Sequence, residues 1–79
     1  MITRLEKLDV EQTAVFALSV IDNKENCRVF SIPLGELSQR IQRWTEGMPV
    51  QYALPMLSAS EREFIVTGIT EEQWNMLFK

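Results

Sequence analysis

Histidine is absent from the 79-residue chain, and cysteine occurs once, as Cys27. Histidine is the base of a Ser-His-Asp nucleophile and the commonest metal ligand. Its absence therefore excludes that nucleophile and nearly excludes a zinc or other transition-metal site. A single cysteine forms no internal disulfide, so the fold has to be stabilised by packing. Free cysteine is most often a small buried apolar residue, and we expect the same of Cys27.

Glycine is also scarce, with Gly35, Gly47 and Gly68 spread far apart along the chain. This scatter excludes a glycine-rich loop that cradles a phosphate, and no stretch has the acid spacing of a calcium-binding loop. The acidic residues of the C-terminal third fall at predicted helix starts or on polar faces, where the helix dipole and solvent explain them. We therefore expect a protein that is not an enzyme and has no catalytic residue, metal or cofactor.

The chain has neither an excess of positive charge nor a long apolar run. A balance of 8 basic against 11 acidic residues gives a net charge of −3, which argues against general affinity for nucleic acid or an anionic membrane. The longest nearly apolar stretch, residues 14–21, is far shorter than the about 20 residues that cross a bilayer. Residues 1–7 lack the apolar core of a signal peptide. These features predict a soluble cytoplasmic protein without membrane contact.

The composition that is present is typical of a small globular protein, with 46% hydrophobic and 24% charged residues. A chain of 79 residues is long enough for one small core, so we expect residues 1–79 to form a single domain. No repeat, linker or low-complexity segment divides the sequence.

The N-terminal half has the pattern of a β-hairpin. Residues 13–21 are rich in β-branched and aromatic side chains, and Thr13 and Ser19 share one face. The opposite face is apolar at four alternate positions: Ala14, Phe16, Leu18 and Val20. A polar run over 22–26 separates this stretch from a second alternating one over 27–32, which predicts two strands joined by a turn.

Two alternatives stay open in this half. A helix over 9–21 is the rival interpretation, although the β-branched residues favour a strand. Residues 1–8 are left unassigned, and a third strand or a covering helix there would complete the monomer. Without such an element a two-stranded sheet has unpaired edges, and strand 13–21 carries no charge or proline that would discourage pairing. We therefore expect a homodimer through the hairpin, with a self-sufficient monomer as the alternative.

Pro33 ends the strand region, because it lacks the N–H of a strand ladder and suits the first turn of a helix. The next residues form an apolar stripe at spacings of three and four: Leu34, Leu37, Ile41, Trp44 and Met48. Gly47 is placed to adopt the left-handed conformation that ends a helix, and Pro49 follows it. Residues 49–54 have room for one short helical turn before the next proline.

The last third is marked by helix caps. Ser58 and Glu61 have the spacing of a capping box, and Gly68 is a natural end for the helix that they open. Thr70 and Gln73 have the spacing of a second box. The final helix is expected to bury Trp74, Leu77 and Phe78. The complete prediction is an α+β fold with an N-terminal β-hairpin followed by three to four short α-helices.

The aromatic residues are the strongest candidates for a binding surface. Four phenylalanines, two tryptophans and one tyrosine are many for so small a core, so some of them should reach the surface. Tryptophan, tyrosine and arginine tend to anchor protein interfaces. The candidate binding residues are Arg40, Arg43, Trp44, Tyr52, Arg62 and Trp74.

The three candidate arginines also allow a different function. Arg40 and Arg43 lie about one helical turn apart, Arg62 could add a third cation, and short helices can form a helix-turn-helix. A small DNA-binding transcriptional regulator is therefore the alternative to a protein-binding module. Nucleic acid is the less favoured partner, because no basic stripe emerges along the C-terminal part.

An ordered series of residues over about 40–78 resembles a module of small uncharacterised proteins from bacteriophages and related mobile elements. The residues that carry the resemblance are Ile41 to Trp44, Gly47, Val50 to Pro55, Leu57-Ser58, Glu61-Arg62-Glu63-Phe64, Thr67 to Thr70 and Trp74. The resemblance implies a phage or prophage product that acts in bacterial cytoplasm, and it implies no activity, cofactor or site residue. We therefore expect a non-enzymatic accessory protein that engages or inhibits a protein of the bacterial host.

Overall fold

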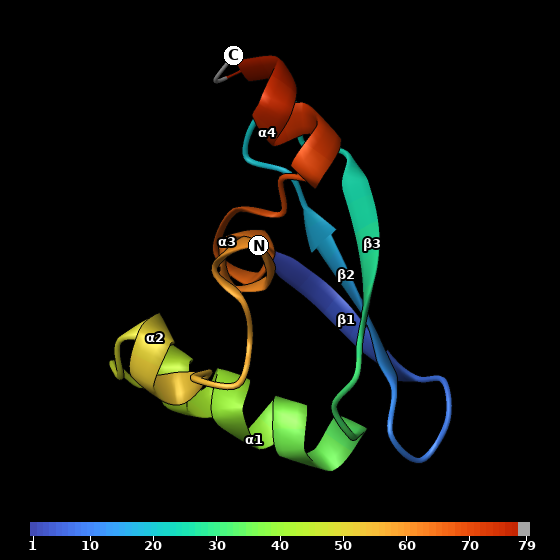
Figure 1. Cartoon of the computed structure of the whole chain (residues 1–79), viewed down its shortest axis with the longest axis vertical. Helices are drawn as coiled ribbons and strands as arrows, with labels where there is room; N and C mark the ends of the chain where they lie inside the picture. The colour runs from blue at the N-terminus through green and yellow to red at the C-terminus, as the bar shows by residue number, and fades with distance from the viewer. Residues whose placement is uncertain (78–79) are drawn as a thin grey trace.

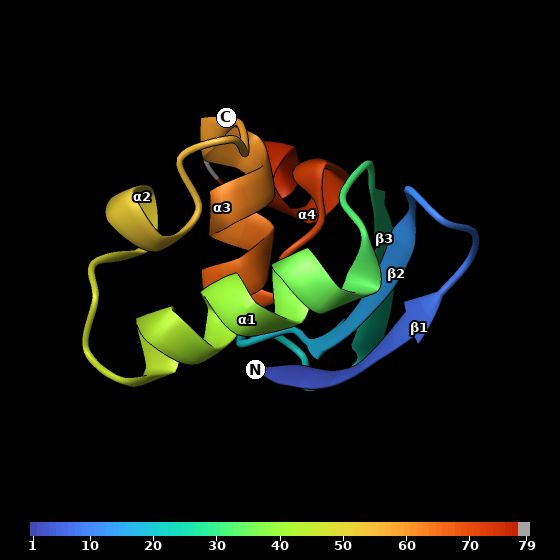
Figure 2. The same ribbon diagram turned by 90° about the horizontal axis from the view of Figure 1, so that it is seen from below.

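The computed structural model describes residues 1–77 as a three-stranded antiparallel sheet followed by four helices. The elements are β1 (Ile2–Lys7), β2 (Thr13–Leu18), β3 (Glu25–Phe30), α1 (Leu34–Thr45), α2 (Val50–Ala53), α3 (Ala59–Thr67) and α4 (Glu71–Leu77). Helices α1, α2 and α3 lie on one side of the sheet, and α4 lies at the end where β2 finishes and β3 begins (Figures 1 and 2). The predicted α+β class and the order of its elements are confirmed.

The sheet has the order β1-β2-β3, so β2 is its central strand. Residues 1–8, which the sequence left unassigned, supply β1, and Leu5 lies opposite Val15 of β2. The helix considered over 9–21 does not form, because β2 pairs along its whole length with β3. Both edges of β2 are therefore occupied within the chain. The predicted route to a homodimer through a free edge of this strand is wrong.

The turn of the predicted hairpin lies earlier in the chain than expected. β2 ends at Leu18 rather than residue 21, and β3 begins at Glu25 rather than residue 27. The Ser19 N–H donates to the carbonyl of Lys24 at 2.9 Å, which closes the turn. Asn23 adopts a φ of 58°, a left-handed conformation that asparagine tolerates better than most residues.

The face of β2 that turns toward the helices is the one opposite to the predicted apolar face. Val15 is buried there, and Thr13 is buried beside it because its hydroxyl donates to the carbonyl of Ile32 at 2.7 Å. Phe16 lies on the open face, where Cζ of Arg4 is 4.0 Å from the centroid of the ring. No helix of residues 1–77 covers this face (Figure 2). Both faces of β2 are apolar, so alternation alone could not select the buried one.

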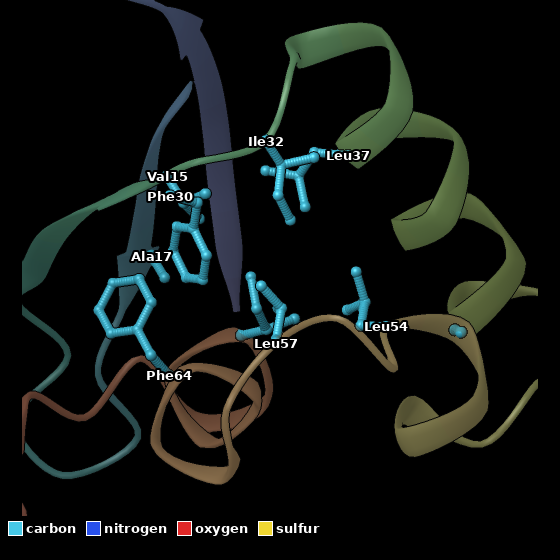
Figure 3. Close-up of a cluster of buried hydrophobic side chains, with 10 residues drawn as sticks. Val15, Ala17, Phe30, Ile32, Leu37, Leu54, Leu57 and Phe64 are labelled. Atoms are coloured by element: carbon cyan, nitrogen blue, oxygen red, sulfur yellow. The ribbon is translucent and has the colours of Figure 1, made fainter. Parts of the chain in front are cut away.

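The core forms where the helix-facing side of β2 and β3 meets the first three helices (Figure 3). Its buried side chains are Val15, Ala17, Phe30, Ile32, Leu37, Ala53, Leu54, Leu57, Phe64 and Ile65. The rings of Phe30 and Phe64 have centroids 6.2 Å apart and planes tilted by 41°, a favourable arrangement for an aromatic pair. Helix α1 inserts Leu37, and Ile41 and Trp44 of the predicted stripe pack against the core from its edge.

The C-terminal end of α1 follows the prediction for Gly47. Its N–H donates to the carbonyl of Trp44 at 3.0 Å, and the N–H of Met48 donates to the carbonyl of Arg43 at 3.1 Å. This pair of bonds is the Schellman motif, which requires the positive φ of 114° that Gly47 adopts. Helix α1 has 12 residues, and no helix within residues 1–77 is long and apolar enough to cross a bilayer.

Both predicted capping boxes are present. Ser58 Oγ accepts from the N–H of Glu61 at 3.1 Å, and the Glu61 carboxylate accepts from the N–H of Ser58 at 2.8 Å. Thr70 and Gln73 form the same reciprocal pair at the start of α4. Gly68 ends α3 with a φ of 70°, in the left-handed region where glycine is favoured. The order of helices was therefore encoded in local residue chemistry.

Two predictions about burial are wrong. Cys27 is exposed rather than buried, because it lies opposite Phe16 on the open side of the sheet. Helix α4 buries no residue, and both Trp74 and Leu77 are exposed. The third member of that predicted stripe, Phe78, lies outside the described residues.

Candidate functional site

Two of the three candidate arginines are bonded to backbone carbonyls near the end of α2. Arg40 donates from Nη1 to the carbonyl of Ala53 at 3.4 Å, and its Nε lies 3.5 Å from a carboxylate oxygen of Glu36. Arg62 donates from Nη1 to the carbonyl of Leu57 at 2.9 Å. Both arginines are partly buried, and cations at such positions satisfy the free carbonyls of a helix end. The two guanidinium groups therefore join α1, α2 and α3 to one another.

The other candidates on this side of the molecule are not brought together in a hollow. Arg43 is exposed and forms no hydrogen bond or ion pair through its side chain within residues 1–77. Trp44 packs against the core and is partly buried, whereas Tyr52 is 68% exposed on α2. These three side chains line neither of the two hollows described below.

Helix α4 and the β2–β3 turn lie at the same end of the molecule (Figure 1), and both carry exposed apolar residues. We call this surface the α4 end, and its residues are Val20, Ile21, Trp74, Met76 and Leu77. Met76 is 76% exposed and Leu77 is 53% exposed, although both belong to a helix of only seven residues. A contiguous set of exposed apolar residues commonly marks a site of protein interaction.

Helix α4 is fixed to the sheet by polar contacts. The amide of Asn26 on β3 donates to the carbonyl of Gly68 at 2.8 Å and to the side-chain oxygen of Gln73 at 3.1 Å. The amide nitrogen of Gln73 donates in turn to a carboxylate oxygen of Asp22 in the β2–β3 turn, also at 3.1 Å. These bonds set the position of α4 without burying any of its apolar side chains.

A groove of about 310 Å³ lies between α3 and α4. It is lined by one stripe from each helix and by the segment that joins them: Ala59, Ser60, Glu63, Ile69, Thr70, Glu71, Trp74 and Asn75. In each stripe, two adjacent residues lie three and four positions from the third, so each helix turns one face toward the groove. Gly68 ends α3 in a left-handed conformation, and residues 68–70 join α3 to α4.

The groove combines an apolar wall with two carboxylates. Glu63 and Glu71 both line it, and neither forms an ion pair or a side-chain hydrogen bond within residues 1–77. No lysine or arginine of residues 1–77 lines the groove, although Arg28 of β3 donates to Oγ of the lining residue Ser60 at 3.1 Å. Ile69, which is buried, and the indole of Trp74 supply the apolar part. This arrangement suits a ligand with an apolar stem and a positively charged end.

A second hollow of about 540 Å³ lies beside the β1–β2 loop, and its lining is polar. It is lined by Asp9, Glu11, Gln12, Ser31 and Pro33. No aromatic residue contributes to it, and none of its lining residues is buried. The groove between α3 and α4 is therefore the better candidate site, because defined binding pockets are mostly apolar with a few polar groups.

Of the six residues singled out from the sequence, only Trp74 lines the groove. Sequence reasoning missed Glu63 and Asn75, because the angle between α3 and α4 depends on tertiary contacts that no local pattern specifies. One signal was available for Glu63. It lies beyond the first turn of α3, so the capping chemistry that explains Glu61 does not explain it.

The described residues show no grouping suited to a metal ion. No cluster of three or more histidine, cysteine, aspartate or glutamate side chains is positioned to bind one within residues 1–77. The groove and the α4 end beside it are the candidate functional features of the described residues.

Comparison with protein-family models, with curated proteins and with solved structures gives no match for this chain.

Proposed function

We propose that the chain is a non-enzymatic protein-binding accessory protein of a bacteriophage or prophage, which engages a bacterial host protein through the α4 end. Its phage origin and its action in bacterial cytoplasm rest on the resemblance of residues 40–78 described above. Its mode of binding rests on the surface chemistry of α4 and the neighbouring turn.

The observation that carries this proposal is that α4 buries none of its residues although three of its seven are large and apolar. The Asn26 amide donates to Gln73, and Gln73 donates to the Asp22 carboxylate, so polar contacts of Gln73 help to hold the helix in place. Exposed apolar side chains that gather on a folded protein commonly mark a site of protein interaction. The exposure of Met76 and Leu77 is then explained by a partner that covers them.

The charge of the chain favours a basic partner. The net charge is −3, and the groove beside the α4 end is bordered by two carboxylates that form no ion pair with any of residues 1–77. Acidic surfaces attract basic ones and can compete with nucleic acid for a basic binding groove. Inhibition of a host protein that binds nucleic acid is one form that this function would take.

The alternative, a small DNA-binding regulator, depends on Arg40, Arg43 and Arg62. Arg40 and Arg62 donate to backbone carbonyls, which leaves Arg43 as the fully exposed cation of the three. Arginines that bind DNA must be free to contact its phosphate backbone, which carries one negative charge per about 1.7 Å of duplex. This arrangement gives the alternative less support than the protein-binding function.

Affinity capture from bacterial lysate tests the proposal when the unmodified chain is compared with two matched variants. The first variant, M76Q/L77Q, makes the α4 end polar without changing its charge. The second, M48Q/Y52Q, does the same to exposed apolar residues beside α1 and α2. We expect one bacterial protein to be retained by the unmodified chain and by M48Q/Y52Q, and to lose affinity by about tenfold or more with M76Q/L77Q.

Two results would contradict the proposal. One is a captured protein that is insensitive to M76Q/L77Q and lost with M48Q/Y52Q. The other is the absence of any captured protein together with binding of short DNA duplexes whose affinity falls steeply with salt. The second result would favour the regulator.

A further inference from the structure

We infer that the groove between α3 and α4 binds a lysine or arginine side chain of the partner protein. The inference rests on the proposed function and adds the chemistry by which the partner is recognised. The α4 end supplies apolar contact area, and the groove beside it supplies a defined position for one basic residue.

The positions of the two carboxylates support this inference. Glu63 projects from the α3 stripe and Glu71 from the α4 stripe, so both walls of the groove carry a negative charge. Glu71 lies in the first turn of α4, where the helix dipole stabilises it. Glu63 lies past the first turn of α3 and has no ion pair or side-chain hydrogen bond within residues 1–77. Its charge is therefore available to a cation of the partner protein as far as the described residues are concerned.

The size and lining of the groove match a single long side chain. A volume of about 310 Å³ is at the lower limit of the roughly 300–1,000 Å³ that small-molecule sites occupy. Ile69 and the indole of Trp74 offer apolar surface for the methylene groups of a lysine or arginine, while its charged head reaches the carboxylates. An indole in the wall also favours a cation through its ring electrons.

Arg28 limits where the incoming charge can lie. Its Nη1 donates to Ser60 Oγ at 3.1 Å, which places one positive charge of this chain at that side of the groove. A cation of the partner is repelled from the side of the groove near Ser60 and is directed toward the carboxylates of Glu63 and Glu71. The groove therefore specifies the position of a basic side chain as well as its charge.

The test is a titration followed by NMR of the backbone amides and the Trp74 indole N–H. The probes are N-acetyl-L-arginine methylamide and the citrulline derivative of the same structure, which has nearly the same shape and no charge. We expect saturable shifts at Glu63, Glu71 and Asn75 with the arginine probe, and an affinity for the citrulline probe lower by about threefold or more. Raising the ionic strength from about 0.01 M to about 0.3 M should weaken binding of the arginine probe only.

Two charge variants complete the test. E63Q/E71Q removes both carboxylates from the groove and should reduce affinity for the arginine probe by about threefold or more. E72Q removes the same kind of charge from a neighbouring position of α4 that does not line the groove, and should leave the affinity nearly unchanged. Equal binding of both probes, shifts confined to residues outside the groove, or equal effects of the two variants would overturn the inference. The probes are single amino-acid derivatives and not a protein partner. Such a result would therefore overturn the inference about the groove without deciding whether the α4 end captures a bacterial protein from lysate.

Discussion

Gly68 is the residue at which the helical half of the chain comes closest to the sheet. A Cβ atom at this position would overlap the carbonyl oxygen of Leu18, and the backbone has a φ of 70°. Replacement by alanine therefore combines steric overlap with a conformation that L-residues adopt at a cost of order 1–3 kcal/mol. We expect Gly68→Ala to lower the free energy of unfolding by about 2 kcal/mol or more in urea titrations.

Gly35 provides the matched control for that substitution. It lies in the first turn of α1, and a Cβ atom there would have no other atom within 4 Å. Alanine at this position should leave stability unchanged or raise it by up to about 1 kcal/mol, because alanine restricts the unfolded chain and favours a helix. Similar losses for both variants would show that the close approach at Gly68 is not what makes glycine necessary.

Alanine substitutions of Arg62 and Arg43 form a second matched pair. Arg62 donates to the carbonyl of Leu57 and is partly buried, whereas Arg43 is exposed without a side-chain partner in the described part of the chain. A hydrogen bond from a charged group contributes about 1.5–3 kcal/mol to the free energy of unfolding, whereas a substitution at an exposed position usually changes it by about 0.5 kcal/mol or less. We expect Arg62→Ala to lower the urea midpoint clearly and Arg43→Ala to leave it in place. Equal effects would contradict the structural role of Arg62.

At the scale of elements, the helices were predictable because their ends are fixed by nearby residues. Ser58 and Glu61, Thr70 and Gln73, and Gly47 all satisfy backbone groups within a few positions along the chain. The sheet was less predictable, because its pairing depends on residues far apart in sequence. The sequence left residues 1–8 open between a third strand and a covering helix, and nothing local indicates that Val15 rather than Phe16 faces the helices. The pattern of β2 is apolar on both faces, so only tertiary contact decides.

Helix α4 should be the least protected helix of residues 1–77, because it buries no side chain. Amide hydrogen exchange measures this directly, since local opening free energies follow buried contacts. We expect the amides of α4 to exchange at least about tenfold faster than those of β2, which lies at the centre of the sheet. Equal protection in the two elements would mean that α4 is part of the cooperative core, and would remove the reason to treat its apolar residues as available for a partner.

For the whole molecule, the structure alters the expected oligomeric state. β1 and β3 are now the edge strands, and β1 carries Arg4, Glu6 and Lys7 as well as an irregularity in its pairing beside Arg4. Charges and bulges are features that discourage edge-to-edge association. We therefore expect light scattering to give a mass near the chain mass of 9.2 kDa across a concentration series. A mass near twice that value at micromolar concentration would restore the homodimer.

The candidate site was predictable in part. The excess of aromatic residues pointed to Trp74, and the missing catalytic groups pointed to a binding function. The groove itself was not predictable, because Glu63 and Glu71 belong to different helices and come together only through the turn at Gly68. The intramolecular contacts of Arg40 and Arg62 were not predictable either. Their guanidinium groups donate to carbonyls of α2 and of the loop that follows it, and these contacts depend on how the helices pack.

Binding through the α4 end is tested most directly by hydrogen exchange on the complex with the captured bacterial protein, compared with exchange in the free chain. We expect new protection in α4, in residues 20–21 and along the groove-facing stripe of α3, with exchange near Arg43 and Tyr52 unchanged. Protection confined to α1 and α2, with α4 exchanging as fast as in the free chain, would contradict the claim that the α4 end is the binding surface.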